Sequence, residues 1–567
     1  MDRTVLPVLQ TSGSAVSLSN IIFSAAVVIV VGIASWIINL VRWRLDYKKL
    51  NGSLKTPPFS LAIGTIPGMI ELAKVTPPRT HPQGLMTMLQ QKYKLDNVFL
   101  LDNYPASAER QLIITDPEVA FHVTQNQSLL KSPTLRKFVA HLCGPTSILY
   151  TEGALWKKTR ALFNPGFAIG HLTTLIPSIV DDTNIFVQTL NKHADADEVF
   201  PIEEDAAHLT IDIMGHIVLD HDLHAQTGKN ELVECFRKTI NWTPPAATIN
   251  PLTGLNPLRP IMYKYYAWKM NSYLDNVLEA RFRSKSDREI TKGKRKPAID
   301  LALDEYEAQQ KERGLEVTGL DAAFKSTSID QMKTFLFAGH DTSSSTICYA
   351  YHLLNLHPES LAKLRKELNK VFPGREAGEM IRENPNLVNK LPYALAVIKE
   401  TLRLFPPAST VRQGDPNVKV TYNGQTYATE GHMVWVVSHA IHRRPDLFPS
   451  PEEFIPERFL PAPDNWQEIP KDAWRPFEKG PRACIGQELA LLEMKIILAM
   501  TAREFDVRAA YEEWDTMLGR EKPGDILGGR RGMFGYRAYQ QLIASAKPVD
   551  GLPAKVTKME NPYSVDI

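Results

Sequence analysis

The first strong feature of the hydrophobic pattern is an uninterrupted apolar run near the start of the chain. Residues 21–41 contain no charged side chain, and at about 1.5 Å per residue a helix of this length crosses the hydrocarbon core of a bilayer. Basic residues follow at once, whereas the tail over 1–20 has only Arg3, offset by Asp2. The positive-inside rule therefore predicts a short lumenal tail over 1–20, a transmembrane helix over 21–41 and a cytosolic remainder. A cleaved signal peptide is the alternative, but the run is long for an h-region and lacks a basic n-region.

Helical and strand patterns divide the rest of the sequence. Residues 42–58 are basic and end in two prolines, so we expect a stiff linker there. From about 150 to 410 apolar residues recur at helical spacing. Short apolar runs before that segment, and a turn signal at Asn423-Gly424 after it, predict small strands. The pattern therefore indicates a mainly α protein with a small β-rich lobe.

Composition narrows the chemistry only slightly. The chain is 44% hydrophobic and 23% charged, which is typical of a globular protein. Its net charge of +2 provides no general argument for nucleic acid, and we expect no nucleic-acid partner. The four cysteines are widely spaced and include no Cys-x-x-Cys pair, so neither a disulfide framework nor a zinc site is indicated. A reducing compartment fits best.

One of these cysteines, Cys484, lies in the distinctive spacing Phe-x-x-Gly-x-Arg-x-Cys-x-Gly over Phe477–Gly486. A cysteine thiolate can bind haem iron and favours O–O cleavage, and Arg482 can pair with a haem propionate. Phe477 can shield the sulfur from water, while Gly480 and Gly486 let the backbone turn tightly and approach a flat ligand. A helical pattern follows, so we expect the thiolate at a helix N-terminus, which stabilises it. A buried structural cysteine is the alternative, but it explains none of the spacing.

A second group of polar residues interrupts a helical pattern running from about Ile329 to His357. Gly339 weakens this helix, and Thr342 can bend it by bonding to the carbonyl of Ala338. An opened helix leaves room for oxygen and a water beside a haem. Asp341 and Thr342 are then candidates for relaying protons to dioxygen. A helix with two polar residues facing solvent explains the same pattern about equally well.

Opposite charges in another apolar helix predict a structural network. Glu400 and Arg403 are three residues apart, which makes them neighbours on a helix. The preceding residues are apolar all round, so these charges need buried partners, and Arg458 is a candidate. We expect Glu400, Arg403 and Arg458 to brace the haem loop without taking part in chemistry. A minor surface salt bridge is the alternative.

The remaining candidate haem contacts come from other segments. Trp156 and Arg160 lie one turn apart on one helix face, which suits them to hold a haem propionate. Ordinary amphipathic patterning is the more common cause of such a pair. Arg412 follows a proline-containing turn and can hold the other propionate.

In this order, these motifs resemble those of the cytochrome P450 superfamily. The resemblance rests on Trp156-x-x-x-Arg160, Ala338-Gly-His-Asp-Thr-Ser343, Glu400-x-x-Arg403, Pro456-Glu-Arg-Phe459 and Phe477–Gly486. It implies a haem-thiolate catalytic domain over 59–555, followed by a C-terminal tail over 556–567. The implied fold is mostly helical with a small β-rich lobe, here preceded by a transmembrane helix. It also implies that a haem b lies between the helix bearing Asp341 and the loop bearing Cys484, with Cys484 as the ligand of the iron.

The resemblance further implies a monooxygenase that inserts one oxygen atom from O2 into a lipophilic small molecule. The sequence has no flavin or nicotinamide fingerprint, so electrons must come from another protein. NADPH–cytochrome P450 reductase is the expected donor, with cytochrome b5 as an additional candidate. Lys157, Lys158 and Lys479 can attract an acidic partner surface. The anchor and motifs look like those of microsomal enzymes of filamentous fungi, which implies a single-pass protein of the endoplasmic reticulum membrane and a step in secondary metabolite biosynthesis, such as that of a polyketide or terpenoid.

Two other functions stay open at this point. One is an electron-independent haem-thiolate isomerase or dehydratase, although such relatives often lose the acid–alcohol pair seen at Asp341-Thr342. The other is a non-catalytic membrane haem protein, such as a sensor or lipid-binding protein. The substrate and the carbon attacked are not indicated by the sequence.

Overall fold

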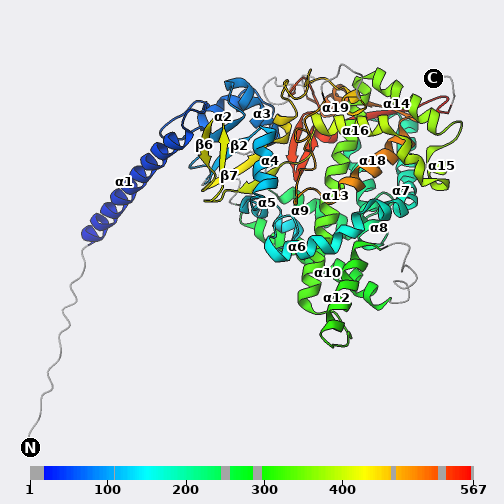
Figure 1. The fold of residues 1–567 in the computed structure, drawn as a ribbon, viewed down its shortest axis with the longest axis horizontal. Helices are drawn as coiled ribbons and strands as arrows, with labels where there is room; N and C mark the ends of the chain where they lie inside the picture. Colours follow the sequence, from blue (N-terminus) through cyan, green and yellow to red (C-terminus); the bar gives the residue numbers. More distant parts are fainter. Residues whose placement is uncertain are drawn as a thin grey trace, which may run out of the picture.

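The computed structural model describes residues 18–107, 109–243, 256–284, 296–461, 468–520 and 532–563. The described part is a mostly helical body with small sheets, from which one long helix projects (Figure 1). The helices are α1 (Leu18–Asn51), α2 (Ile66–Ala73), α3 (Pro82–Tyr93), α4 (Pro117–Phe121), α5 (Pro133–Cys143), α6 (Gly153–Phe163), α7 (Ile169–Ala196), α8 (Ile202–Leu219), α9 (Glu231–Trp242), α10 (Leu258–Arg283), α12 (Ala298–Glu312), α13 (Ala322–Leu356), α14 (Pro358–Val371), α15 (Ala377–Glu383), α16 (Pro392–Leu404), α17 (Ser438–Ile441), α18 (Gln487–Thr501) and α19 (Tyr511–Met517). Shorter turns of 3₁₀ or π helix are η1 (His122–Asn126), η2 (Asn164–Phe167), η4 (Pro385–Lys390), η5 (Pro456–Phe459) and η6 (Val549–Gly551).

Small sheets form the β-rich lobe and line one side of the helical body. The strands are β1 (Val98–Leu101), β2 (Arg110–Ile114), β3 (Phe200–Pro201), β4 (Thr410–Gln413), β5 (Lys419–Tyr422), β6 (Gln425–Ala428), β7 (His432–Val436), β8 (Phe505–Ala509), β9 (Gln540–Ile543), β10 (Ser545–Pro548) and β11 (Pro553–Lys558). In the lobe the strand order is β1-β2-β7-β4, with β2 parallel to β7 and the other pairs antiparallel. The expected hairpin is confirmed as β5–β6, whose turn residues Asn423 and Gly424 both have positive φ. A second sheet has the order β3-β11-β8, in which β3 comes from the first half of the chain, and β9 and β10 form a separate pair.

Helix α13 runs through the middle of the body (Figure 1) and packs against α8, α16, α5, α18 and β10. It is capped by Asp321, whose carboxylate accepts the N–H of Phe324. Between Ser328 and Leu354 every residue is buried except Ala338, Gly339 and Thr342. Their spacing places these three residues on one face of the helix. This face is therefore the part of the central helix that other protein atoms leave uncovered.

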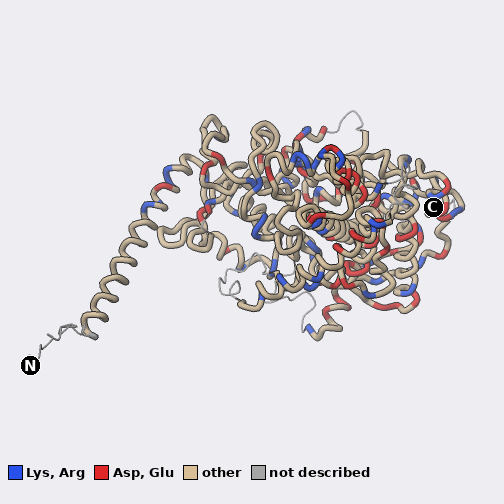
Figure 2. Tube along the Cα trace, turned by 90° about the horizontal axis from the view of Figure 1, so that it is seen from below, with Lys and Arg blue, Asp and Glu red and all other residues tan. Residues whose placement is uncertain are grey.

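Helix α1 is apolar, and its side chains are exposed over most of its length. Large side chains such as Phe23 and Val28 are 72% and 70% exposed, so nothing in the described part of the chain covers them. Figure 2 shows that charged residues appear on α1 only near the body. By length and composition this helix can cross a membrane.

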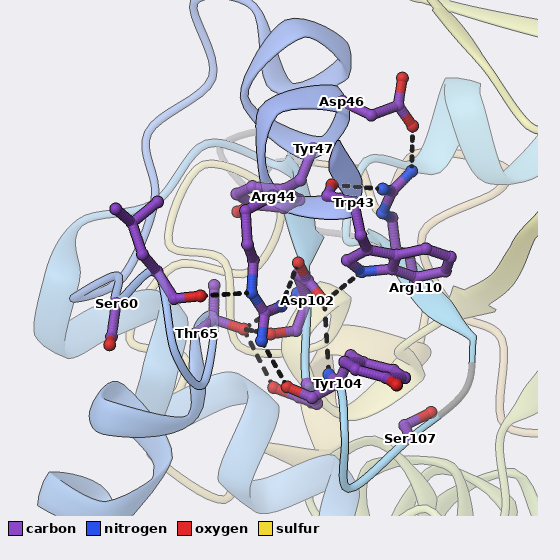
Figure 3. Close-up of polar contacts among 12 residues, drawn as sticks. Trp43, Arg44, Asp46, Tyr47, Ser60, Thr65, Asp102, Tyr104, Ser107 and Arg110 are labelled. Carbon is purple, nitrogen blue, oxygen red and sulfur yellow. Dashed lines mark hydrogen bonds and ion pairs between the residues drawn. The ribbon is translucent and has the colours of Figure 1, made fainter. Parts of the chain in front are cut away.

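The end of α1 differs from the linker expected over 42–58. Residues 42–51 continue the helix and pack on the β-rich lobe. Arg44 is fully buried, forms an ion pair with Asp102 and donates to the carbonyl of Tyr104 at 2.6 Å (Figure 3). The indole of Trp43 donates to the same carboxylate at 2.9 Å.

A second set of contacts fixes the same end of α1. Arg110 on β2 lies over the ring of Trp43 at 4.0 Å and pairs with Asp46 at 2.7 Å. Tyr47 is 1% exposed and donates to the carbonyl of Leu100 at 3.0 Å. The basic pattern suggested a linker because these partners lie about 60 residues away and are visible only once the chain has folded.

Candidate active site

The Cys484 loop is closed by its own backbone and leads directly into α18. The N–H of Cys484 donates to the carbonyl of Phe477 at 2.9 Å, and that of Ala483 donates to Gly480 at 3.0 Å. Phe477 is half-buried beside Trp474, with ring centroids 6.0 Å apart. α18 begins three residues after the cysteine, at Gln487, which confirms the helix expected there.

The two glycines of the loop serve different purposes. Gly480 has a φ of +81°, and a Cβ there would lie 2.6 Å from Cγ of Gln125, so both the turn and the close approach need glycine. Gly486 has an ordinary φ of −88°, which any residue adopts. A Cβ at Gly486 would lie 4.0 Å from Sγ of Cys484. The expectation of a tight turn therefore holds for Gly480, whereas the absence of a side chain at Gly486 leaves space beside the sulfur.

Cys484 is exposed, and groups around it shift the pKa of its thiol in both directions. Burial raises this pKa, while the N–H of Gly486 and the charges of Arg160 and Lys131 lower it. The two positive charges therefore favour the thiolate.

Two arginines expected at the haem propionates lie close together with unused donors. Arg412 on β4 is fully buried, and its Nη1 donates to the carbonyl of Leu129 at 3.0 Å. Its Nε and Nη2 find no hydrogen-bond acceptor among the described residues, and neither does Nη1 of Arg482. Arg482 pairs with Glu152 at 2.6 Å through its other nitrogen. Burial and then the charge of Arg482 together lower the pKa of Arg412 to about 10.

Lys131 completes this cationic group, although no sequence motif marks it. Its backbone pairs with that of Arg412 in an isolated antiparallel β-bridge. Its ammonium donates to the hydroxyl of Thr410 at 3.0 Å. Burial and then the charge of Arg412 lower the pKa of Lys131 to about 7. The charges of Glu478 and Glu152 oppose this effect only in part. An anionic ligand would restore the balance.

Trp156 and Arg160 on α6 contact the Cys484 loop from the other side. The guanidinium of Arg482 lies over the ring of Trp156 at 4.3 Å. Arg160 donates from Nη1 to the carbonyl of Ala483 at 2.9 Å. Both expected residues therefore lie at the site, with Trp156 stacked on a propionate candidate and Arg160 bound to the residue before the cysteine.

On α13 the expected backbone contact is present. The hydroxyl of Thr342 donates to the carbonyl of Ala338 at 2.9 Å. Gly339 has a further role, because a Cβ there would lie 2.4 Å from Sδ of Met214 on α8. Asp341 is fully buried and does not share the uncovered face with Thr342. Its carboxylate is 2.8 Å from the ammonium of Lys547 on β10.

The charged residues of α16 form the buried network that the spacing predicted. Arg403 binds both oxygens of Glu400, at 2.7 and 2.8 Å, and Arg458 reaches the same carboxylate at 3.3 Å. The side chains are 0–3% exposed. His442, which no motif in the sequence singled out, links this network to the cysteine loop. It contacts the carbonyl of Arg403 at 3.0 Å and accepts the N–H of Arg475 at 2.9 Å.

These features together fit a haem. Cys484 is exposed, the partly exposed face of α13 bears only small side chains, and Arg412 and Arg482 keep donors without acceptors among the described residues. Cys484 can supply the axial thiolate, and Arg412, Arg482 and Lys131 can bind the carboxylates. A haem would thereby satisfy the guanidinium nitrogens that the described residues leave without acceptors.

Comparison with known proteins agrees with this geometry. Residues 63–521 match the family model described as Cytochrome P450. The chain is 38% identical to "Cytochrome P450 monooxygenase acrF" of Aspergillus aculeatus, over 85% of this chain and 99% of that protein. It is 36% identical to "Cytochrome P450 monooxygenase polC" of Polytolypa hystricis, over 96% and 97%. The fold is similar to the crystal structure of the cytochrome P450DA heme domain, with a TM-score of 0.68, 18% identity and coverage of 90% of this chain and 97% of that one.

Proposed function

The chain belongs to the cytochrome P450 family and is a monooxygenase of that family, and from this premise we propose how its own residues serve the reaction. The proposal is a haem b enzyme that oxidises a lipophilic small molecule with O2 and electrons delivered by a separate protein. The observation that carries it is the exposed Cys484 beside positive groups, together with the nitrogens of Arg412 and Arg482 that lack acceptors among the described residues.

The proposed haem is held by residues from four separate segments. Cys484 would ligate the iron, and Arg412 and Arg482 would bind the propionates through nitrogens without acceptors among the described residues, with the ammonium of Lys131 beside them. Trp156 orients Arg482 by stacking under its guanidinium. When bound, the haem supplies the activation of dioxygen.

The protein atoms near the sulfur prepare the thiolate. Gly486 donates its backbone N–H, and the positive charges of Arg160 and Lys131 oppose the effect of burial on the thiol. The rings of Phe477 and Trp474 pack against each other beside the loop and add apolar surface near the sulfur.

On α13, we assign proton delivery to Asp341 and Thr342. Thr342 is partly exposed, and its hydroxyl is held by the carbonyl of Ala338. A hydroxyl in this position can accept a hydrogen bond and pass a proton on. Asp341, the preceding residue, is the nearest carboxylate in the sequence and can supply that proton. The small side chains beside Thr342 leave room for substrate and oxygen.

Electrons would come from NADPH–cytochrome P450 reductase, with cytochrome b5 as an additional candidate donor. Lys157 and Lys158 on α6 are exposed on the same helix that contacts the cysteine loop, which suits an acidic partner. Lys479 suits this role less well, because it is half-buried and its ammonium donates to the carbonyl of Lys471. The docking surface is therefore assigned to the two lysines of α6.

Helix α1 would anchor the protein in the endoplasmic reticulum membrane, with the catalytic domain over 59–555 in the cytosol. The buried contacts of residues 43–47 support a helix that is retained in the mature protein. Removal of a signal peptide near residue 41 would cut α1 directly before these residues. An enzyme held at the membrane surface has access to lipophilic substrates. The relatives named acrF and polC come from fungi, and we place this enzyme among those that modify fungal secondary metabolites.

Replacing Cys484 with serine tests the proposal directly. The variant should lose the red-shifted Soret band of the ferrous carbonyl complex and all NADPH-dependent turnover, because a serine hydroxyl does not provide the thiolate. The buried Cys348→Ser variant is the matched control and should keep the red-shifted band. Turnover by C484S at the rate of the native protein would reject the proposal. Turnover without oxygen and reductant would instead indicate an electron-independent isomerase or dehydratase.

A further inference from the structure

A second group of buried polar side chains lies between the C-terminal half of α13 and the segment just before β9. Tyr349 and His352 are on α13, whereas Arg443 follows α17. All three are buried, with exposed fractions of 0%, 5% and 3%. Tyr349 comes seven residues after Thr342, which places it about 10 Å further along the helix axis. The group is therefore separate from the residues to which we assign proton delivery.

Aromatic rings join the two side chains of α13. The ring of Tyr349 is stacked on that of Phe405, with centroids 3.9 Å apart, and the ring of Phe405 meets that of Tyr536 at 5.1 Å. The ring of His352 lies edge-on to Tyr536, with centroids 6.1 Å apart. Tyr349 and His352 therefore belong to one aromatic cluster.

Arg443 is part of the same cluster. Its guanidinium lies over the ring of Phe534 at 4.7 Å, and its Nε donates to the carboxylate of Glu452 at 3.0 Å. The backbone carbonyl of Glu452 accepts the hydroxyl of Tyr536 at 3.2 Å, so this ion pair lies beside the aromatic rings. Burial raises the pKa of Tyr349 well above its usual value, and the charge of Arg443 acts in the opposite direction. The guanidinium and the phenol are thus close enough to interact.

Several polar atoms of this cluster lack partners. Among the described residues, Nη1 and Nη2 of Arg443, the hydroxyl of Tyr349 and both ring nitrogens of His352 find no hydrogen-bond partner. A guanidinium has only donors, and a phenol and a neutral imidazole can each supply one more. A buried donor without an acceptor is costly, and native proteins satisfy nearly all of them. The cluster therefore requires an acceptor.

The charges in this part of the molecule indicate that the acceptor is an anion. The side chains of Arg403, Arg443 and Arg458 are at most 3% exposed. Among the described residues two carboxylates pair with them: Glu400, which serves Arg403 and Arg458, and Glu452, which is 40% exposed. Burial and the charge of Arg403 lower the pKa of Arg443, whereas Glu452 opposes them. Three buried cations thus face two carboxylates, and one further negative charge would balance them.

We propose that the cluster binds one small monovalent anion, such as chloride, between Arg443 and Tyr349. The anion would accept the unused N–H groups of Arg443 and the hydroxyl of Tyr349, and His352 can turn a ring N–H toward it. Chloride has the single charge that the cluster requires, whereas a phosphate dianion would exceed it. A water molecule would fill the same space without balancing the charge, so water is the alternative to be distinguished. The site is independent of the haem chemistry proposed above.

The chloride dependence of thermal unfolding tests the site in the full-length protein. Chloride replaces gluconate at constant ionic strength, so that only the identity of the anion changes. The unfolding midpoint of the native protein should rise with chloride and then level off, because a ligand that binds only the folded state stabilises it. Y349F should need about tenfold more chloride for half of this rise, since it loses one hydrogen bond to a charged partner. R443M should show no rise.

Y351F is the matched control. Tyr351 is on the same helix and is also buried, but its hydroxyl is bonded to that of Thr501 at 2.7 Å. This variant should unfold at a lower temperature in every buffer and keep the native response to chloride. The proposal is overturned if chloride leaves the native midpoint unchanged, if Y349F responds as Y351F does, or if R443M keeps the full rise. Should R443M not fold, the comparison of the two tyrosine variants decides alone.

Bromide identifies the occupant directly. Crystals of the native protein grown in bromide should show an anomalous-scattering peak within hydrogen-bond distance of Nη1 or Nη2 of Arg443, because bromide can replace chloride at such a site. Density at this place without an anomalous signal would mean that a water molecule occupies it, and would overturn the assignment. Bromide peaks found only beside exposed lysines and arginines would do the same.

Discussion

At the scale of single residues, the site depends on positions where the backbone leaves no room for change. Gly480 combines a φ of +81° with a neighbouring side chain only 2.6 Å from the place of a Cβ. It therefore determines how closely the cysteine loop approaches η1, which contains Gln125. The spacing of the motif predicted a glycine with a tight turn here, but the neighbour that excludes a side chain was not visible in the sequence.

The variant G480A should destabilise the protein more than G374A. Gly374 has a φ of +65°, but nothing lies within 4 Å of the place that a Cβ would take, so it carries the backbone strain without the collision. The extra cost at Gly480 should be about 1–3 kcal/mol, and haem incorporation should fall with it. Thermal unfolding and the haem-to-protein absorbance ratio measure the two effects. Equal destabilisation by both variants would show that the contact with Gln125 has no importance.

At the scale of elements, α18 and α13 are joined behind the site by a buried carboxyl group. Ser343 on α13 donates from its hydroxyl to Glu493 on α18, and Oε2 of Glu493 finds no partner among the described residues. Burial raises the pKa of Glu493 from 4.5 to about 8, and the bond from Ser343 opposes this only in part. The helix that begins at the cysteine loop is thus connected to the helix that carries Thr342.

This carboxyl group predicts a pH dependence of stability. Since its folded-state pKa is raised, the folded protein binds one more proton than the unfolded chain between pH 4.5 and about 8. The contribution of this bound proton to the free energy of unfolding is complete below pH 4.5 and is lost as the pH rises through about 8. Between these two values the free energy of unfolding falls by about 1.4 kcal/mol per pH unit. The variant E493Q should remove this component. Thermal unfolding of both proteins between these limits measures it, and parallel curves would contradict the assignment.

The distance in sequence between contacting residues decides which parts of the site can be predicted from the sequence. The cysteine loop, the Glu400–Arg403 pair and the Thr342 contact were predictable because each depends on residues within a few turns of one another. Lys131 and Lys547 were not, because each acquires its role from a partner more than 200 residues away. A lone lysine in a short apolar segment produces no periodic signal. Only tertiary packing brings it to a carboxylate or to another cation.

At the scale of the whole molecule, the joint between α1 and the β-rich lobe connects the apolar helix to the catalytic domain. Arg44 has no exposed surface, and beyond Asp102 its donors are used by the carbonyls of Leu61, Ala62 and Tyr104. This joint explains why charges that suggested a linker instead belong to a continuous helix.

Variants of this joint should change stability without touching the haem site. R44M and D102N should each cost about 3–5 kcal/mol, because each leaves the other charge buried and unpaired, and the double variant should recover part of that loss. R42M is the matched control, since Arg42 is exposed and two residues away. Thermal unfolding of the native protein and the four variants in one detergent measures these differences. An unchanged unfolding midpoint for R44M would show that α1 is not joined to the domain in this way.

Because α1 is continuous and fixed to the β-rich lobe, its tilt in the membrane also sets the orientation of the catalytic domain. An apolar helix that is longer than the hydrocarbon layer around it responds by leaning, and the angle follows the thickness of the lipid. Because α1 continues unbroken to the residues that bind Asp102, any such lean must turn the catalytic domain as well. The composition of the surrounding bilayer would then decide which face of the enzyme lies against the headgroups.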